Sequence, residues 1–193
     1  MMGFDQLPVA FHFFLAAIVV PFIPAGRLRG MLMLAVPILA AYNIWQMGFG
    51  NFATASFMGF DLELMRVDSL SRVFTLIFCL AAFLGNLYAW HLKDTTQQVS
   101  ALLYSGSAIG AALAGDLITL FFYWEGTAIA SVFLIWARGT QGAYNTGMRY
   151  LLIQIGSGVI LIAGVVLYFD ETSSIAFENM SLGSLGTWLI FLS

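Results

Sequence analysis

One carboxylate, Glu125, stands near the middle of a stretch that is otherwise almost wholly apolar, Leu117–Trp136. A helix of about 20 apolar residues is long enough to cross the hydrocarbon core of a bilayer, which is ~30 Å thick. Holding a charged side chain at the centre of such a helix costs roughly 3 kcal/mol on insertion scales. We therefore expect Glu125 to have a function inside the membrane.

Proton exchange is the chemistry that suits a carboxyl group in this position. Low-dielectric surroundings disfavour the charged form of a carboxyl, and a group that takes up and releases a proton can act in a relay. Such a relay needs polar neighbours and water. Gln154 and Ser157, in the apolar run Gly147–Phe169, are candidates for lining a hydrated path beside Glu125. The alternative for Gln154 and Ser157 is packing between helices. The alternative for Glu125 is a carboxyl that stays protonated at a helix interface.

The other polar residues predict structural roles. Asp116 comes directly before the run that contains Glu125, where a carboxylate suits the positive N-terminal end of a helix. His12 is a lone histidine in an apolar run, which favours a packing residue with a hydrogen bond. The sequence has no Gly-rich phosphate loop, no Cys/His metal spacing and no Ser/His/Asp arrangement. We therefore expect neither a cofactor nor a bound metal.

The composition is that of an integral membrane protein. Of 193 residues, 61% are hydrophobic and 9% are charged, whereas soluble domains carry about 25% charged residues. The mean hydropathy is +0.91. The net charge of −3 is small and no basic cluster indicates a nucleic-acid partner. The single cysteine, Cys79, cannot form an intramolecular disulfide.

The apolar runs predict an all-α polytopic bundle of transmembrane helices in one domain, residues 1–193, with six full spans and a partial seventh. In chain order they are Leu7–Pro24, Met31–Phe49, Ser69–Trp90, Val99–Ala114, Leu117–Trp136, Gly147–Phe169 and the partial run Gly186–Ser193. Eight residues of helix rise about 12 Å and do not cross a bilayer. The last run is therefore expected to be interfacial, or the chain to be shortened relative to a longer ancestor.

Gly50–Asp68 is one of two longer connections between the predicted spans. Within it, Asp61 and Glu63 alternate with Leu62 and Leu64. This alternation is typical of a strand with one buried face, so the segment predicts a small surface hairpin. An irregular loop is the alternative.

Basic residues in the loops predict the orientation. Cytoplasmic loops carry an excess of Lys and Arg, and five such residues fall on one side of the predicted membrane against two on the other. This arrangement places the N-terminus outside. The five are Arg27, Arg29, Lys93, Arg138 and Arg149, and the two are Arg66 and Arg72.

Rows of small residues predict which helices touch. Gly106, Gly110 and Ala114 recur every four positions in one run, and Gly126 and Ala130 do so in the next. Small residues at this spacing let helix backbones approach closely in lipid, so the two runs are expected to pack on these faces. Chance spacing of abundant glycine and alanine is the alternative.

Three motifs resemble antiporter-like subunits of respiratory complex I and of multi-subunit cation/proton antiporters. The run AGDLITLFFYWEG, residues 114–126, resembles the start of the family's fifth helix, with its Trp-Glu pair. The run RVDSLS, residues 66–71, resembles the entry to the third helix. GMRYL at 147–151 and QIGSG at 154–158 resemble the sixth helix of the D-type antiporter subunit.

The resemblance implies that Glu125 is the proton-handling carboxyl of the fifth helix and that a lysine of the seventh helix is its partner. Family members are longer and contain two inverted repeats, so this chain resembles their N-terminal portion. The only lysine here, Lys93, lies in a predicted loop. The resemblance therefore implies that this sequence contains the carboxyl, but not the lysine, of a charge relay.

We therefore predict a proton-translocation subunit of a multi-subunit membrane complex, either a cation/proton antiporter or a complex I-like assembly. Its partners would be other membrane subunits, the lipid bilayer, protons and a monovalent cation, with the bacterial inner membrane as its location. The alternative is a shortened antiporter-like paralogue that serves as a structural or accessory transmembrane subunit. Transport or an accessory role is favoured over catalysis, and a small-molecule transporter is a third reading.

Overall fold

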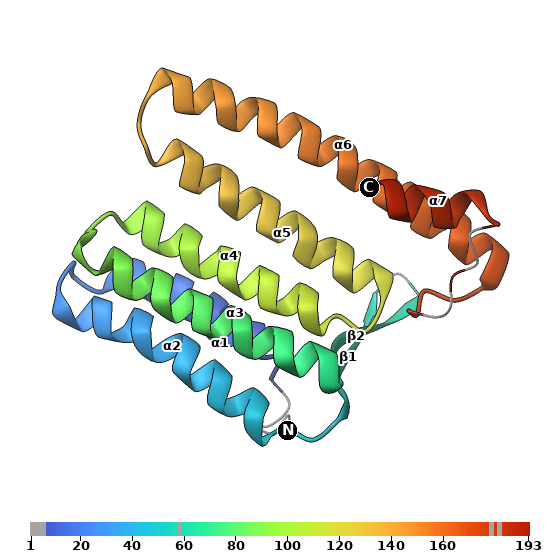
Figure 1. Ribbon diagram of the computed structural model, residues 1–193, viewed down its shortest axis with the longest axis horizontal. Coiled ribbons are helices and arrows are strands. Elements are labelled where there is room, and N and C mark those ends of the chain that lie inside the picture. Colours follow the sequence, from blue (N-terminus) through green and yellow to red (C-terminus); the bar gives the residue numbers. More distant parts are fainter. Residues whose placement is uncertain (1–6, 58, 178–179, 181–182) are drawn as a thin grey trace.

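The computed structural model describes residues 7–57, 59–177, 180 and 183–193. It is a bundle of antiparallel helices with one β-hairpin (Figure 1). The α-helices are α1 (Ala10–Val19), α2 (Arg27–Gln46), α3 (Ser69–Tyr88), α4 (Thr95–Leu113), α5 (Leu117–Trp136), α6 (Gln141–Thr172) and α7 (Leu185–Leu192). Two 3₁₀ helices, η2 (Val20–Phe22) and η3 (Ala89–His91), extend α1 and α3, and the strands are β1 (Gly50–Phe57) and β2 (Phe60–Val67).

Every predicted span corresponds to a helix of the bundle. Among the described residues, four helices are long and apolar enough to cross a membrane: α2, α3 with η3, α5 and α6. The first predicted span is a shorter apolar helix that changes to 3₁₀ geometry where Pro21 enters it. The fourth predicted span, α4, lies inside the bundle against α1, α3 and α5. The structure therefore supports a membrane helix bundle, while the count of six crossings stays a prediction.

Polar caps decide where the helices begin. Asp94, Asp116 and Thr140 each accept a hydrogen bond from a backbone N–H in the first turn of the helix that follows. Such caps satisfy donors that have no partner inside the helix. Because Asp94 and Thr140 lie upstream of the apolar runs, α4 and α6 begin earlier than hydrophobicity alone predicted. α5 has the predicted bounds, and the predicted cap Asp116 is confirmed.

Glycines bring α4 and α5 together, as the sequence predicted, but one glycine of the predicted row contacts a different helix. A Cβ on Gly110 would overlap the ring of Tyr123 in α5, and a Cβ on Gly126 would lie 2.7 Å from Oγ of Ser107 in α4. Gly106 instead faces α1, where a Cβ would lie 2.8 Å from that of Phe13. The row of small residues on α4 therefore serves two neighbours, because α4 is surrounded on several sides.

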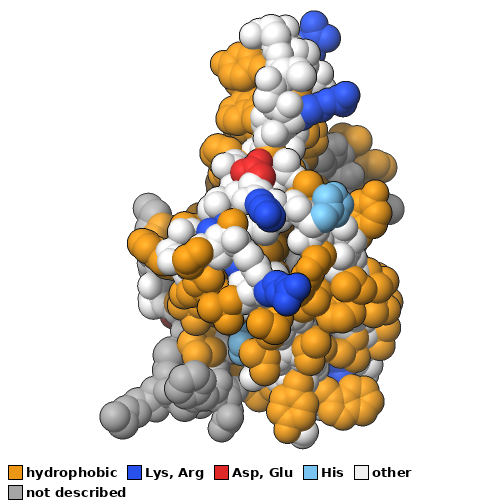
Figure 2. Space-filling view, turned by 90° about the vertical axis from the view of Figure 1, so that its left-hand side faces the viewer, with side chains coloured by type: hydrophobic (Ala, Val, Ile, Leu, Met, Phe, Trp, Pro, Cys, Tyr) orange, Lys and Arg blue, Asp and Glu red, His pale blue; other side chains and the backbone are white. Residues whose placement is uncertain are grey.

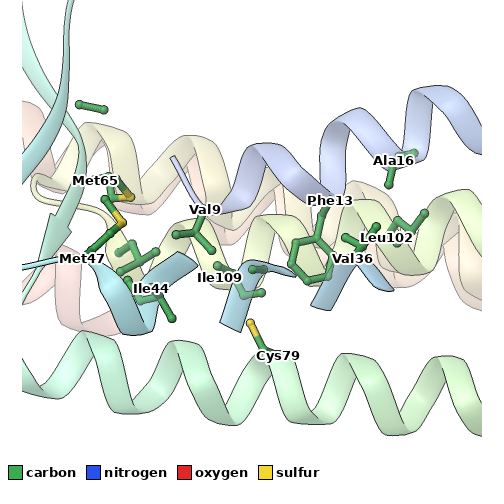
Figure 3. Packing of buried hydrophobic residues seen from close by; sticks show 14 of the residues in the cluster. Val9, Phe13, Ala16, Val36, Ile44, Met47, Met65, Cys79, Leu102 and Ile109 are labelled. Atoms are coloured by element: carbon green, nitrogen blue, oxygen red, sulfur yellow. The ribbon is translucent and has the colours of Figure 1, made fainter. Parts of the chain in front are cut away.

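The main apolar core lies where α1, α2, α3 and α4 meet the hairpin (Figure 3). Phe13, Ile44, Met65 and Ile109 are completely buried in it. The outward faces of the helices stay apolar and exposed, as at Ile153, which is 75% exposed. An apolar exterior around a packed core is expected for helices that face lipid.

The segment Gly50–Asp68 contains the predicted hairpin. β1 and β2 pair antiparallel, with Gly50 opposite Val67. Asp61 is exposed and Leu62 is buried, as the alternation predicts. A register shift then passes over Leu64, so that Leu64 is half-buried and Met65 is the next buried residue. An irregular loop is thereby excluded for this segment.

Asp116 joins the hairpin to the helices. Its carboxylate accepts hydrogen bonds from the backbone N–H and the hydroxyl of Thr119, each at 2.7 Å, and from the backbone N–H of Glu63 in β2, also at 2.7 Å. Next to it, the backbone N–H of Gly115 donates to the carbonyl of Glu63 at 2.9 Å, and that of Leu117 donates to Ile175 at 3.0 Å. Asp116 is 2% exposed. One buried carboxylate therefore holds the start of α5 and the hairpin in one junction.

The opposite end of the bundle carries the predicted basic loops. The connections α1–α2, α3–α4 and α5–α6 lie together there (Figure 1), and Lys and Arg side chains are visible on that end (Figure 2). One of the five, Arg29, is buried and donates to Thr95 at 2.8 Å and to Gln98 at 3.1 Å, which fastens α2 to α4. The basic residues thus share one end, and the side of the membrane that it faces stays a prediction.

We predict that Asp116→Ala lowers the free energy of unfolding by about 1–3 kcal/mol, because the buried donors of Thr119 and Glu63 lose their acceptor. The midpoint of thermal unfolding in detergent should fall, and protease should cleave the hairpin faster. Asp61→Ala, on the exposed side of the same hairpin, is the matched control and should change neither. Equal effects of the two substitutions would contradict the role given to Asp116.

Candidate functional site

Glu125 lies near the centre of α5, and its carboxyl group rests against α6 at Gly158. A Cβ on Gly158 would overlap Oε1 of Glu125 and lie 2.9 Å from its Cδ. The Oε1 atom is buried and has no hydrogen-bond partner among the described residues. Buried polar atoms in folded proteins are almost always hydrogen-bonded. Glu125 is therefore held in place by packing and keeps an unused acceptor.

The next residue, Gly126, brings α4 to the same level. Its missing Cβ leaves room for the buried hydroxyl of Ser107. Gly126 thus lets α5 approach α4, and Gly158 lets the Glu125 carboxyl of α5 approach α6. The sequence indicated Gly126 through the spacing of small residues, but gave Gly158 no role. The available signal was its place in the run QIGSG, four residues after Gln154.

A cavity of about 590 Å³ opens beside this contact, between α3, α4, α5 and α6. Gln154 lines it, and lies one turn before Gly158 on the same face of α6. Glu125 is not among the lining residues, but its neighbour Trp124 is. Uncharged polar side chains that line the cavity are Ser71, Thr127, Tyr150 and Gln154.

The two predicted path residues point in different directions. Gln154 lines the cavity, whereas the hydroxyl of Ser157 donates to the backbone carbonyl of Ser193 beside α7 at 2.5 Å. The structure therefore brings Gln154, but not Ser157, to the open space near Glu125. A role of Ser157 in a hydrated path stays a prediction.

One end of the cavity lies at the hairpin, where Arg66 and Asp68 contribute to its wall. Arg66 stands over the ring of Phe177, 5.6 Å from its centroid. Asp68 caps α3 by accepting a hydrogen bond from the backbone N–H of Ser71 at 2.7 Å. This bond lowers the pKa of the Asp68 carboxyl from its ordinary value. This end of the cavity therefore carries both signs of charge, while most other lining residues are apolar.

Hydroxyl groups follow α5 from the cavity toward the basic end. Thr127 donates to the carbonyl of Tyr123 at 3.0 Å, and the Ser131 hydroxyl lies 3.0 Å from that of Tyr150, within a hydrogen bond. Sequence reasoning missed these residues and the cavity. Ala108, Ala111 and Ala112, which form its floor on α4, were the signal available.

The other candidates have structural contacts. Nδ1 of His12 lies 3.0 Å from the carbonyl of Val9, within the same turn, in keeping with the packing role predicted for it. Lys93 is exposed beyond η3, at the basic end of the bundle. The described residues contain no group of His, Cys, Asp and Glu that would hold a metal ion.

Comparison with known proteins places these features in context. Residues 114–193 match the family model described as NADH:quinone oxidoreductase/Mrp antiporter, TM. The Na(+)/H(+) antiporter subunit A1 of Staphylococcus aureus, in strains RF122 and JH9, is 29% identical over 130 residues, which are 64% of this chain. The chain spans 16% of the length of these relatives.

Solved structures show the same fold. A chain of the Mrp complex from Dietzia sp. DQ12-45-1b matches with a TM-score of 0.75 and 24% identity, over 88% of this chain and 20% of that one. A chain of respiratory complex I from Thermus thermophilus with bound aureothin matches with a TM-score of 0.75 and 16% identity, over 97% and 42%. The predicted resemblance to antiporter-like subunits is confirmed. The relatives carry the name subunit A1, so the closer likeness to the D-type subunit stays a prediction.

We predict that water fills the cavity. In a Cys79→Ser background, Thr127→Cys should react with a charged, membrane-impermeant thiol reagent in native membranes, because the reactive thiolate forms where water is present. Ile129→Cys is the matched control on the same helix. Ile129 lies on the outer surface of the bundle, 51% exposed, and should stay unmodified in lipid. Absence of labelling at Thr127→Cys would contradict a hydrated cavity.

Proposed function

This chain belongs to the antiporter-like family of membrane subunits, and we propose that it takes part in proton translocation within a multi-subunit membrane complex. It would act as one transmembrane domain of that complex, with Glu125 as the group that takes up and releases the proton. The bacterial cytoplasmic membrane is its proposed location, in keeping with the bacterial relatives. A monovalent cation is the proposed counter-ion, since the relatives are named Na(+)/H(+) antiporter subunits.

The unpartnered Oε1 of Glu125 is the observation that supports this proposal most directly. A carboxyl that served only to join helices would be expected to use both oxygens in hydrogen bonds, because an unsatisfied buried polar atom is costly. Asp116 illustrates such a structural carboxylate: it accepts hydrogen bonds on both oxygens. Glu125 differs from it in this respect.

Gln154 is the proposed link between Glu125 and water. It lines the cavity that reaches Arg66 and Asp68 at the hairpin end, and an amide can both donate and accept hydrogen bonds. Water held at Gln154 would then bring a proton to within one helical turn of the Glu125–Gly158 contact. Thr127, Ser131 and Tyr150 offer further hydroxyls along the same side of α5 and α6.

A positive partner for Glu125 would come from another chain of the complex or from a C-terminal continuation of this one. The family resemblance implies a lysine, and in this sequence the only one, Lys93, is exposed at the basic end of the bundle. An opposite charge close to a carboxyl stabilises its ionised form and thereby controls when the proton leaves. We therefore propose that proton movement requires Glu125 together with a positive group outside residues 1–193.

A second candidate is a structural or accessory subunit of another energy-transducing membrane complex. The position of Lys93 also favours this reading, since the described residues place no lysine beside Glu125. In that case the carboxyl would stay protonated and act only in packing.

We predict that Glu125→Gln abolishes proton-coupled transport by the assembled complex. The amide keeps the shape of the side chain but cannot carry the proton. Transport is measured as the pH change inside everted membrane vesicles, and assembly as co-purification of the partner subunits.

Asp61→Asn, which removes an exposed carboxylate of the hairpin, is the control and should leave both transport and assembly unchanged. Normal transport by an assembled Glu125→Gln complex would contradict the relay and favour the accessory role.

A further inference from the structure

We infer that Gly158 is a positioning residue for Glu125. The space left by its absent side chain holds the Glu125 carboxyl against α6, and so fixes where the proton is carried. This inference rests on the proposed function and names a second residue on which that function depends.

The geometry at Gly158 is specific to one group. The three atoms nearest to an added Cβ are Oε1, Cδ and Oε2, all of the Glu125 carboxyl, with Cδ at 2.9 Å and Oε2 at 3.5 Å. Contacts below about 3 Å to a Cβ are essentially never seen, so one side chain would have to move. Gly158 is also buried within α6. The carboxyl thus occupies the volume that any other residue would fill.

Other glycines of α6 have different surroundings. Gly147 faces the indole ring of Trp136, and Gly164 faces the backbone of α7 near Ile190. Gly156 and Gly142 face nothing within 4 Å. Glycine inside a helix is destabilising relative to alanine, so a buried glycine whose three nearest neighbouring atoms all belong to one ionisable group suggests a requirement set by that group.

This placement determines the approach of Glu125 to the cavity. The α6 backbone beside Gly158 lies inside the helix, where its N–H groups are already bonded. The carboxyl therefore sits against α6 without gaining a fixed donor, which agrees with the unpartnered Oε1. Gln154 lies one turn away on the same face. A Cβ at position 158 would push the carboxyl away from α6 and change its distance to water held at Gln154.

Simple packing of α5 on α6 is the competing explanation, and it makes a different prediction. If Gly158 only lets the helices approach, Gly158→Ala should reduce the amount of assembled complex but leave the turnover of each complex unchanged. If Gly158 positions Glu125, the turnover of each assembled complex should fall.

The experiment compares Gly158→Ala with Gly156→Ala in the intact membrane complex. Both substitutions add one methyl group to α6, but Gly156 is exposed and free of contacts. Proton transport per assembled complex is measured in everted vesicles. We expect Gly156→Ala to stay within about twofold of the unmodified protein and Gly158→Ala to lose about tenfold or more, since small misplacements of reacting groups reduce rates strongly. Equal turnover for the two variants would overturn the inference.

A double substitution tests the size relation directly. Glu125→Asp shortens the side chain by one methylene, and Gly158→Ala adds one methyl on the facing helix. The combined variant keeps the total volume and should transport faster than Gly158→Ala alone. If Gly158→Ala prevents assembly, restoration of assembly by Glu125→Asp supports the contact. Losses that simply multiply, or assembly that is not restored, would overturn it.

The Glu125→Gln complex separates this inference from the proposed function. Loss of transport in Glu125→Gln together with normal turnover in Gly158→Ala removes only the positioning role. Normal transport in Glu125→Gln removes the relay itself, and with it the basis for a positioning residue.

Discussion

The buried carboxylate of Asp116 is the interaction on which the hairpin end of the bundle depends. Away from water, every backbone N–H and C=O must find a partner within the protein, and the break between α4 and α5 interrupts the helical bonds that provide this. Asp116 caps α5 and accepts from β2 at the same time, while its neighbours bond to Glu63 and Ile175. The wall of the cavity at this end, which includes Arg66 and Asp68, lies next to this junction, since Arg66 donates to the carbonyl of Gly115.

From that junction α5 runs to a level where two contacts depend on glycine: Gly126, on α5 itself, faces α4, and Gly158, on α6, faces α5. Ser107 fits beside Gly126, and the Glu125 carboxyl fits beside Gly158. Helices in lipid gain little from the hydrophobic effect between them, so close contact at small residues takes its place. The same glycines that let the helices approach also make room for an ionisable group between them.

Local features of this fold could be predicted from the sequence, because their causes are local. Asp116 caps the helix that follows it, and Asp61 alternates with Leu62 in a strand. The neighbours of α4 could not be predicted, since a row of small residues shows that a face permits close approach but not which helix uses it; Gly106 turned out to face Phe13. Gly158 was missed for the same reason, because its contact depends on how α6 is rotated against α5.

The length of α6 has a consequence for how the bundle fits its membrane. Its 32 residues rise about 48 Å, at 1.5 Å per residue, which exceeds the ~30 Å hydrocarbon thickness. The excess lies in polar turns at both ends, around Gln141 and Thr172, so thicker or thinner bilayers can be accommodated there by tilt and by overhang. Gly158 and Glu125 both lie close to the centres of their helices. Their contact therefore stays near mid-depth when the thickness of the lipid changes.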